Sequence, residues 1–136
     1  MAVKVGVIGV GYLGQHHARI YSELEETELV AVVDIDREKA GALAAKYNCE
    51  ALDNYREIFH KVDALSIVTP TTFHYSIALD CLREDKDILI EKPVTVTIEE
   101  ADDLIKESRH RDLIIQVGHI ERYNPAILAA SDLFNT

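Results

Sequence analysis

The sequence has few cysteines and no long apolar run. Its 136 residues include two cysteines, Cys49 and Cys81, whose spacing fits neither a disulfide framework nor a metal site. We therefore expect buried thiols in a reducing compartment, no metal ligands and a cytoplasmic protein. No apolar stretch approaches the roughly 20 residues of a membrane helix. The N-terminus also lacks the long apolar segment and cleavage site of a signal peptide.

Positive charge is also scarce. Lysine and arginine number 14 against 24 aspartates and glutamates, which gives a net charge of −10. Nucleic acids and anionic membranes are bound by basic patches, so we expect neither as a partner. A hydrophobic content of 48% and a charged content of 28% are ordinary for a soluble globular protein, and the length fits one domain.

Six short apolar runs alternate with amphipathic stretches that carry helix-start signals. Asp36 precedes "REKAGALAAKY", and Thr97 with Glu100 forms a capping box at "TIEE". Nearly continuous apolar runs are typical of parallel strands buried on both faces. The alternation predicts an α/β fold, a doubly wound parallel sheet in three α/β/α layers, which is a Rossmann fold. The expected strands are Val3–Ile8, Leu29–Val33, Glu50–Leu52, Ala64–Val68, Asp87–Ile90 and Leu113–Val117.

Three glycines spell G-x-G-x-x-G between the first expected strand and the first expected helix. Gly9 would make the tight turn, Gly11 would let a pyrophosphate approach the backbone, and Gly14 would let the helix pack closely. The amides of Tyr12 and Leu13 would then point at the phosphates from the helix N-terminus. The motif therefore predicts a dinucleotide site.

An acidic residue lies where such a site needs one. Asp34 comes 20 residues after Gly14, at the end of the second expected strand, where a carboxylate can bind ribose hydroxyls. It would repel a 2′-phosphate, so we expect NAD rather than NADP, although the neighbouring Arg37 is a cation. For Arg37 the alternative is a solvated helix residue. The alternative to a dinucleotide site is that the three glycines only form a turn and that Asp34 only caps a helix.

Polar residues follow the fourth expected strand, at the sheet edge where ligands lie in this fold. A helix is expected next, over Thr72–Glu84. His74 either contacts the cofactor or is only a first-turn helix residue. For His16 and His17, in the first expected helix, we expect a packing or surface role. The residues expected to line the cofactor crevice are Thr69, Pro70 and Thr71.

The fifth expected strand ends in "ILIEKPV", which places Glu91 and Lys92 at the same crevice. A lysine there could lose solvation, and its lowered pKa would suit proton transfer. It could also hold a substrate hydroxyl.

Together, "GVGYLG", "TPTTFH" and "EKP" resemble the glucose–fructose oxidoreductase / inositol dehydrogenase / MocA family, over the whole chain and in the family's order. The resemblance implies an N-terminal domain that binds NAD(P), with Lys92 as the catalytic lysine contacting nicotinamide and substrate. It also implies cofactor contact at Pro93 and a cis Lys92–Pro93 bond. The implied activity is hydride transfer between a sugar or nucleotide-sugar hydroxyl and nicotinamide.

In that family a second α/β domain supplies most of the substrate pocket and, usually, an Asp-x-x-x-His pair with the histidine as base. We expect no such domain within these 136 residues. We expect residues 1–120 to form the dinucleotide-binding domain and 121–136 to begin a connection to an absent second domain, with no turnover by this chain alone. A helix after Asn124 would carry an apolar face of Ile127, Leu128, Leu133 and Phe134.

The sixth expected strand ends in "VGHIERYNPA", with His119, Arg122 and Tyr123 on the crevice side as candidate substrate residues. This segment is similar to family members that act at C3 of nucleotide-linked amino sugars, the UDP-N-acetylglucosamine 3-dehydrogenase-like proteins. The alternative for Arg122 is a pair with a surface acid. We further expect a homo-oligomer in the full-length form. The alternative functions are a stand-alone, non-catalytic NAD-binding or redox-sensing module and a Rossmann enzyme of another family.

Overall fold

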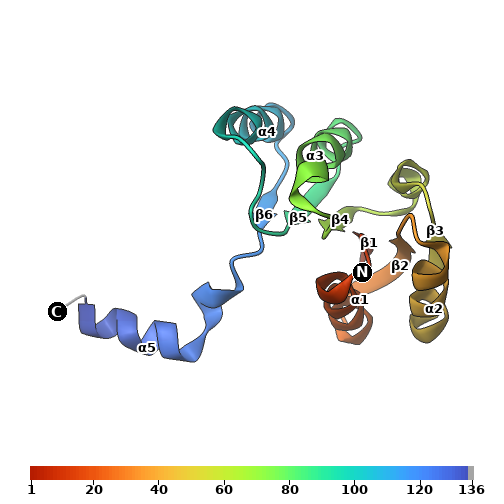
Figure 1. Cartoon of the computed structure of the whole chain (residues 1–136), viewed down its shortest axis with the longest axis horizontal. Coiled ribbons are helices and arrows are strands. Elements are labelled where there is room, and N and C mark those ends of the chain that lie inside the picture. Colours follow the sequence, from red (N-terminus) through yellow and green to blue (C-terminus); the bar gives the residue numbers. More distant parts are fainter. Residues whose placement is uncertain (135–136) are drawn as a thin grey trace.

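A computed structural model of the chain shows a six-stranded parallel sheet with helices on both faces (Figure 1). The structure describes the backbone of residues 1–134 and the side chains of residues 1–131. The strand order β3-β2-β1-β4-β5-β6 is that of a doubly wound Rossmann sheet, which confirms the predicted fold class. The strands are β1 (Val3–Ile8), β2 (Thr27–Val33), β3 (Glu50–Leu52), β4 (Ala64–Ile67), β5 (Asp87–Ile90) and β6 (Ile115–Val117).

The helices fall into two groups on opposite sides of the sheet (Figure 1). α1 and α2 lie on one side, and α3 and α4 lie on the other. Three short 3₁₀ helices complete the connections. The bounds are α1 (Tyr12–Glu23), α2 (Arg37–Tyr47), α3 (His74–Arg83), α4 (Ile98–Arg111), α5 (Pro125–Phe134), η1 (Tyr55–Lys61), η2 (Thr71–Phe73) and η3 (Ile120–Tyr123).

Each face of the sheet has its own apolar core, because successive strand residues point to opposite faces. Val5 and Val7 of β1 pack with Ala18 of α1, whereas Leu65 and Ile67 of β4 pack with residues of α3 and α4. Between those two β4 residues, Ser66 points to the α1 face, and it is completely buried. A polar side chain in the core needs hydrogen-bond partners, and those of Ser66 lie in α1.

The local signals for helix starts are confirmed. The Asp36 carboxylate accepts the Lys39 amide at 3.2 Å, and Thr97 and Glu100 form both halves of a capping box. Three strand ends differ from the prediction by one or two residues, at Thr27, Ile67 and Ile115, and the helix expected from Thr72 starts later. The chain first makes the 3₁₀ turn η2 and becomes α-helical only at His74.

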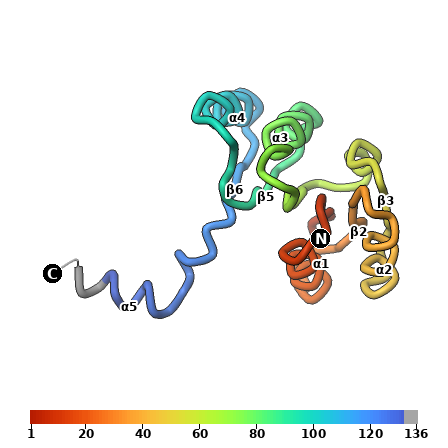
Figure 2. Tube along the Cα trace, viewed as in Figure 1, coloured from red at the N-terminus to blue at the C-terminus, as the bar shows by residue number. Residues whose placement is uncertain are grey.

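The last helix, α5, projects away from the sheet instead of packing on it (Figure 2). Its predicted start is confirmed, since Pro125 is its first residue and the Asn124 Oδ1 accepts the Ala126 amide at 2.9 Å. Ile127 and Leu128 are about half exposed. The other two residues of the predicted apolar face, Leu133 and Phe134, lie outside the described side chains.

Both thiols are free in the described residues, and only Cys81 is fully buried. Burial raises the pKa of the Cys81 thiol far above its usual range, so this sulfur is protonated and unreactive. Cys49 is partly buried, which is less than predicted. No helix among the described residues is both long and apolar enough to cross a bilayer.

Candidate functional site

The candidate site lies at the carboxyl ends of β1 and β4. At this point the strand order reverses, because β1 pairs with β2 on one side and with β4 on the other. The connections after β1 and β4 leave toward opposite faces of the sheet, which opens a crevice for ligands in this fold.

Two glycines of the loop are required by the packing of the protein itself. Gly9 has a φ of +92°, and an added Cβ there would lie 2.7 Å from the Val68 carbonyl oxygen. A Cβ at Gly14 would lie 1.9 Å from the Gly9 carbonyl oxygen. These glycines therefore let the loop turn beside β4 and let α1 approach the loop, as predicted.

The middle glycine is different. A Cβ at Gly11 would meet no atom within 4 Å, and its φ of −64° is one that any residue can adopt. The protein therefore gives no steric reason for a glycine there. α1 begins immediately afterwards with no side-chain cap, so the first amides of the helix, those of Tyr12 and Leu13, lack the usual side-chain acceptor. Open space above bare amides at a helix N-terminus fits a dinucleotide pyrophosphate.

Asp34 lies directly after β2, at the adenosine end expected for such a ligand. Its Oδ2 accepts the Val10 amide at 2.9 Å, and its Oδ1 accepts the Asp36 amide at 2.9 Å. These two bonds fix the carboxylate beside the glycine loop. An ionised carboxylate accepts about four hydrogen bonds, so both oxygens retain capacity for ribose hydroxyls.

Arg37, the cation that could favour a 2′-phosphate, is engaged elsewhere. Its guanidinium pairs with the carboxylate of Asp53, which follows β3. Among the described residues, no cation of α2 pairs with Asp34, so Arg37 does not compensate its negative charge.

A buried histidine, His74, contacts the loop that follows β4. The His74 Nε2 lies 2.8 Å from the Thr69 carbonyl oxygen, and its Nδ1 lies 2.9 Å from the Pro93 carbonyl oxygen. Only 1% of His74 is exposed. His74 therefore connects the segment after β4 to the segment after β5. Contact of its ring with a cofactor remains a prediction.

The neighbours of His74 include one buried polar atom without a partner. The Thr69 Oγ1 is buried and has no hydrogen-bond partner among the described residues. Buried hydroxyls are almost always satisfied, so an unpaired one at the crevice is consistent with a ligand or water position. Pro70 is exposed and Thr71 is partly exposed, as residues that line a crevice would be.

Lys92 and Pro93 follow β5, and the bond between them is cis, which confirms that prediction. Both residues are exposed in this chain. The loss of solvation predicted for the lysine would therefore require a covering surface beyond these residues.

Glu91, the residue before Lys92, has a carboxylate that lies against α1. Its Oε1 is 3.0 Å from the His17 Nε2, and its Oε2 accepts the Lys92 amide at 3.3 Å. The other ring nitrogen of His17 lies 3.1 Å from the Ser66 Oγ, which is 2.7 Å from the Tyr21 hydroxyl. The side chains of Glu91, His17, Ser66 and Tyr21 therefore form one continuous hydrogen-bonded row.

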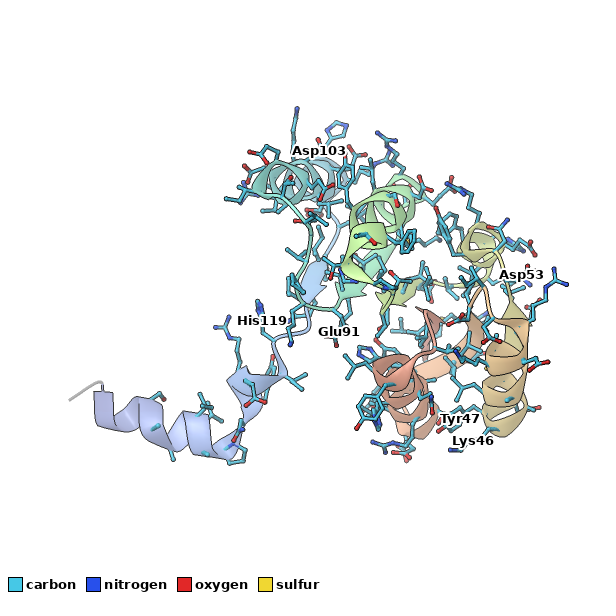
Figure 3. The ribbon with its side chains drawn as sticks, viewed as in Figure 1. Lys46, Tyr47, Asp53, Glu91, Asp103 and His119 are labelled. Carbon is cyan, nitrogen blue, oxygen red and sulfur yellow. The ribbon has the colours of Figure 1, made fainter. Side chains whose placement is uncertain are left out.

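The loop after β6 also touches this row. A Cβ at Gly118 would lie 2.8 Å from all three terminal atoms of the Glu91 side chain, so any other residue there would displace the carboxylate from its position. Figure 3 shows Glu91 and His119 at the ends of adjacent strands. His119, Arg122 and Tyr123 are exposed, and Arg122 pairs with no carboxylate among the side chains that the structure describes.

Sequence reasoning missed His17, Ser66, Tyr21 and Gly118 as parts of the site. One signal was present, because Ser66 interrupts the apolar run "ALSIV". His17 and Glu91 are 74 residues apart, and no local pattern indicates their pairing.

Comparison with known families gives a match over most of the chain. The profile described as "Oxidoreductase family, NAD-binding Rossmann fold" (GFO_IDH_MocA) matches residues 3–119.

Individual relatives agree with this match. The chain is 42% identical over 125 residues to the UDP-N-acetylglucosamine 3-dehydrogenase of Acidithiobacillus ferrooxidans, an alignment that covers 92% of this chain and 39% of that protein. It is 35% identical over 142 residues to an inositol 2-dehydrogenase/D-chiro-inositol 3-dehydrogenase of Lacticaseibacillus casei, and this alignment covers 100% of this chain and 41% of that protein. The chain thus spans about two fifths of the length of these curated relatives.

Solved structures show the same likeness in three dimensions. The UDP-N-acetylglucosamine 3-dehydrogenase from Acidithiobacillus ferrooxidans superposes with a TM-score of 0.91 at 39% identity, covering 98% of this chain and 43% of that one. The myo-inositol dehydrogenase from Lactobacillus casei, in complex with NAD(H) and myo-inositol, superposes with a TM-score of 0.90 at 33% identity. The superposition covers 99% of this chain and 42% of that one.

Proposed function

The chain belongs to the GFO_IDH_MocA oxidoreductase family with its NAD-binding Rossmann fold, and from this premise we propose that it binds NAD for a dehydrogenase acting on a nucleotide-linked amino sugar. The observation that carries the proposal is the contrast within the glycine loop. Gly9 and Gly14 are required by the protein's own packing, whereas Gly11 faces open space at a helix N-terminus. That space is where a pyrophosphate fits.

NAD is favoured over NADP by the charges at the adenosine end. The carboxylate of Asp34 is fixed by two backbone amides, and the one nearby arginine on α2, Arg37, pairs with Asp53. Ribose hydroxyls can donate to this carboxylate, whereas a 2′-phosphate would be repelled by it.

In the proposed reaction, NAD supplies the acceptor for a hydride that leaves the carbinol carbon of the sugar. Lys92 holds the hydroxyl on that carbon through its ammonium group, which also favours the developing alkoxide. His74 keeps the two loops beside the crevice at a fixed separation through its contacts with Thr69 and Pro93. The base that takes the hydroxyl proton would come from residues outside this chain.

The substrate class rests on the relatives and on the exposed side chains after β6. His119, Arg122 and Tyr123 lie at the end of the strand next to Lys92's strand. A guanidinium without a carboxylate partner suits the diphosphate of a nucleotide sugar, and an exposed tyrosine suits a base or sugar face.

The remaining parts of the proposal concern the whole protein. Residues 1–120 would form the dinucleotide-binding domain, and residues 121–136 would begin a connection to a substrate domain. The half-exposed Ile127 and Leu128 on α5 support such a connection. We also propose a cytoplasmic location, supported by two free thiols, and a homo-oligomeric full-length form.

The test has two stages. In the first, NADH is titrated into the 136-residue chain while nicotinamide fluorescence is followed, and Lys92→Ala serves as the comparison for contact at the nicotinamide. In the second, the protein that carries the second domain is assayed for NADH formation with UDP-N-acetylglucosamine and with myo-inositol. Binding without turnover of any sugar by that longer protein would favour a non-catalytic NAD-binding module instead.

A further inference from the structure

The backbone that carries Lys92 is held on both sides. After it, His74 lies 2.9 Å from the Pro93 carbonyl oxygen, and before it comes Glu91. Glu91 makes the last ladder contact at this end of β5, where its amide donates to the Ile67 carbonyl at 3.0 Å. The next amide, that of Lys92, donates to the Glu91 side chain at 3.3 Å. The path of the chain at Lys92 therefore depends on the position of the Glu91 carboxylate as well as on His74.

The carboxylate of Glu91 is in turn held by α1. Glu91 is only 8% exposed, and a carboxylate so far from water must be paired or hydrogen-bonded. Its partners among the described residues are the His17 Nε2 at 3.0 Å and the Lys92 amide. Gly118 closes the third side, because any side chain there would overlap the carboxylate.

His17 is itself oriented by two hydroxyls. One assignment of the protons satisfies the whole row with a neutral ring, since Tyr21 can donate to Ser66, Ser66 to the His17 Nδ1, and the Nε2–H to Glu91. Ser66 is completely buried in β4, so the row has a rigid support. Without His17, the Glu91 carboxylate would retain one longer hydrogen bond and would turn toward water.

We infer that His17 is a positioning residue of the proposed reaction centre: by holding the Glu91 carboxylate, it supports the N-terminal side of the backbone that presents Lys92, while His74 supports the other side. The inference rests on the proposed function, because it takes Lys92 to act at the nicotinamide. It also gives α1 two tasks. The helix binds the pyrophosphate through its N-terminal amides and, one turn later, holds the segment that would contact the nicotinamide.

The test compares two ligands on the 136-residue chain by calorimetry. NADH contains the nicotinamide ring, whereas ADP-ribose contains only the part expected to lie on the glycine loop and Asp34. Lys92→Ala is measured first, and we expect NADH binding to weaken about tenfold with ADP-ribose within about twofold. Equal effects on both ligands, or none, would refute the role of Lys92 and hence the proposed function itself.

Given that scale, His17→Ala should reproduce the selective loss, weakening NADH about three- to tenfold and ADP-ribose less than about twofold. Arg19→Ala is the matched control, because Arg19 lies on the same helix and pairs only with Glu23 on the surface. We expect it to change neither affinity. A selective loss in Lys92→Ala but equal or no loss in His17→Ala would overturn the inference while leaving the proposed function standing.

A second variant covers the case in which His17→Ala does not fold. Glu91→Gln keeps the size of the side chain and removes its charge, so the same selective loss is expected. The double variant His17→Ala/Glu91→Gln should lose no more NADH affinity than Glu91→Gln alone, since both changes break the same contact between His17 and Glu91. Additive losses, or equal losses for NADH and ADP-ribose in Glu91→Gln, would contradict the inference.

Discussion

The α-carbon of Gly14 approaches the Gly9 carbonyl so closely that a Cβ would lie 1.9 Å from the oxygen, and this contact locks the first turn of α1 onto the loop. Gly11, between them, has no neighbour within 4 Å of the same position. Two glycines of the motif therefore serve packing, and for the third, Gly11, we propose a role in ligand approach.

The first prediction separates these purposes. Gly14→Ala should destabilise the fold by about 2–4 kcal/mol, because the added methyl meets a backbone oxygen that cannot move away. Gly11→Ala should change the free energy of unfolding by less than about 1 kcal/mol, and it should weaken NADH binding at least about tenfold. Thermal unfolding and NADH titration of both variants measure the difference. Equal stability of the two variants would contradict the assignment of the packing role.

The second prediction concerns cofactor choice at Asp34. Asp34→Ala should shift the ratio of NADPH to NADH affinity toward NADPH by about tenfold or more, because the repulsive carboxylate is gone. It should also cost about 1–3 kcal/mol of stability, since the Val10 and Asp36 amides lose their acceptor. Glu38→Ala, which removes an exposed acid from the first turn of α2, is the control and should leave the ratio unchanged. Tighter binding of NADPH than of NADH by the unaltered chain would refute the role of Asp34.

The third prediction concerns alkaline stability. Burial, followed by the hydrogen bond to Asp80 at 2.7 Å and that residue's charge, raises the pKa of Tyr55 to about 12. Since unfolded tyrosines ionise near pH 10, the contribution of Tyr55 to stability is complete below about pH 10 and is lost as the pH rises to about 12. Ultraviolet titration of the phenolate should show this late step, and Asp80→Asn should move it to lower pH. An unchanged titration curve in that variant would rule out the contact.

The fourth prediction concerns α5. Ile127 and Leu128 are each about half exposed, and burying one such side chain fully is worth roughly 1.5–3 kcal/mol. The 136-residue chain should therefore associate with rising concentration in sedimentation experiments. The variant Ile127→Asp/Leu128→Asp should abolish this association. Ile98→Asp on α4, where the side chain is more exposed, is the control and should not. A chain that stays monomeric at all concentrations would show that α5 needs no partner.

Much of the fold follows from local signals in the sequence. The apolar runs, the capping box at Thr97 and the glycine spacing each act within a few residues, and the structure contains all three. The helix after β4 starts later than expected, because the residues after Pro70 form a 3₁₀ turn before His74. His74, the first residue of the α-helix, contacts the carbonyls of Thr69 and Pro93, and no local pattern indicates the contact with Pro93.

The site was predictable in part for the same reason. Gly11 and Asp34 are proposed from their spacing, since the role expected of each depends on its own position in the βα unit. Glu91 was expected to face the crevice, and its carboxylate lies instead against His17 and Gly118. That arrangement depends on three segments brought together by the sheet order. A direct contact of Glu91 with the cofactor remains a prediction.

The central claim is that the dinucleotide lies on the glycine loop, with its adenosine end at Asp34 and its nicotinamide end near Lys92. Two-dimensional amide NMR of the 136-residue chain during titration with NADH tests it most directly. We expect saturable shifts that are largest at the amides of Gly11, Tyr12 and Leu13, with further shifts at Asp34 and Lys92. Shifts confined to other parts of the chain, or none at millimolar NADH, would contradict it.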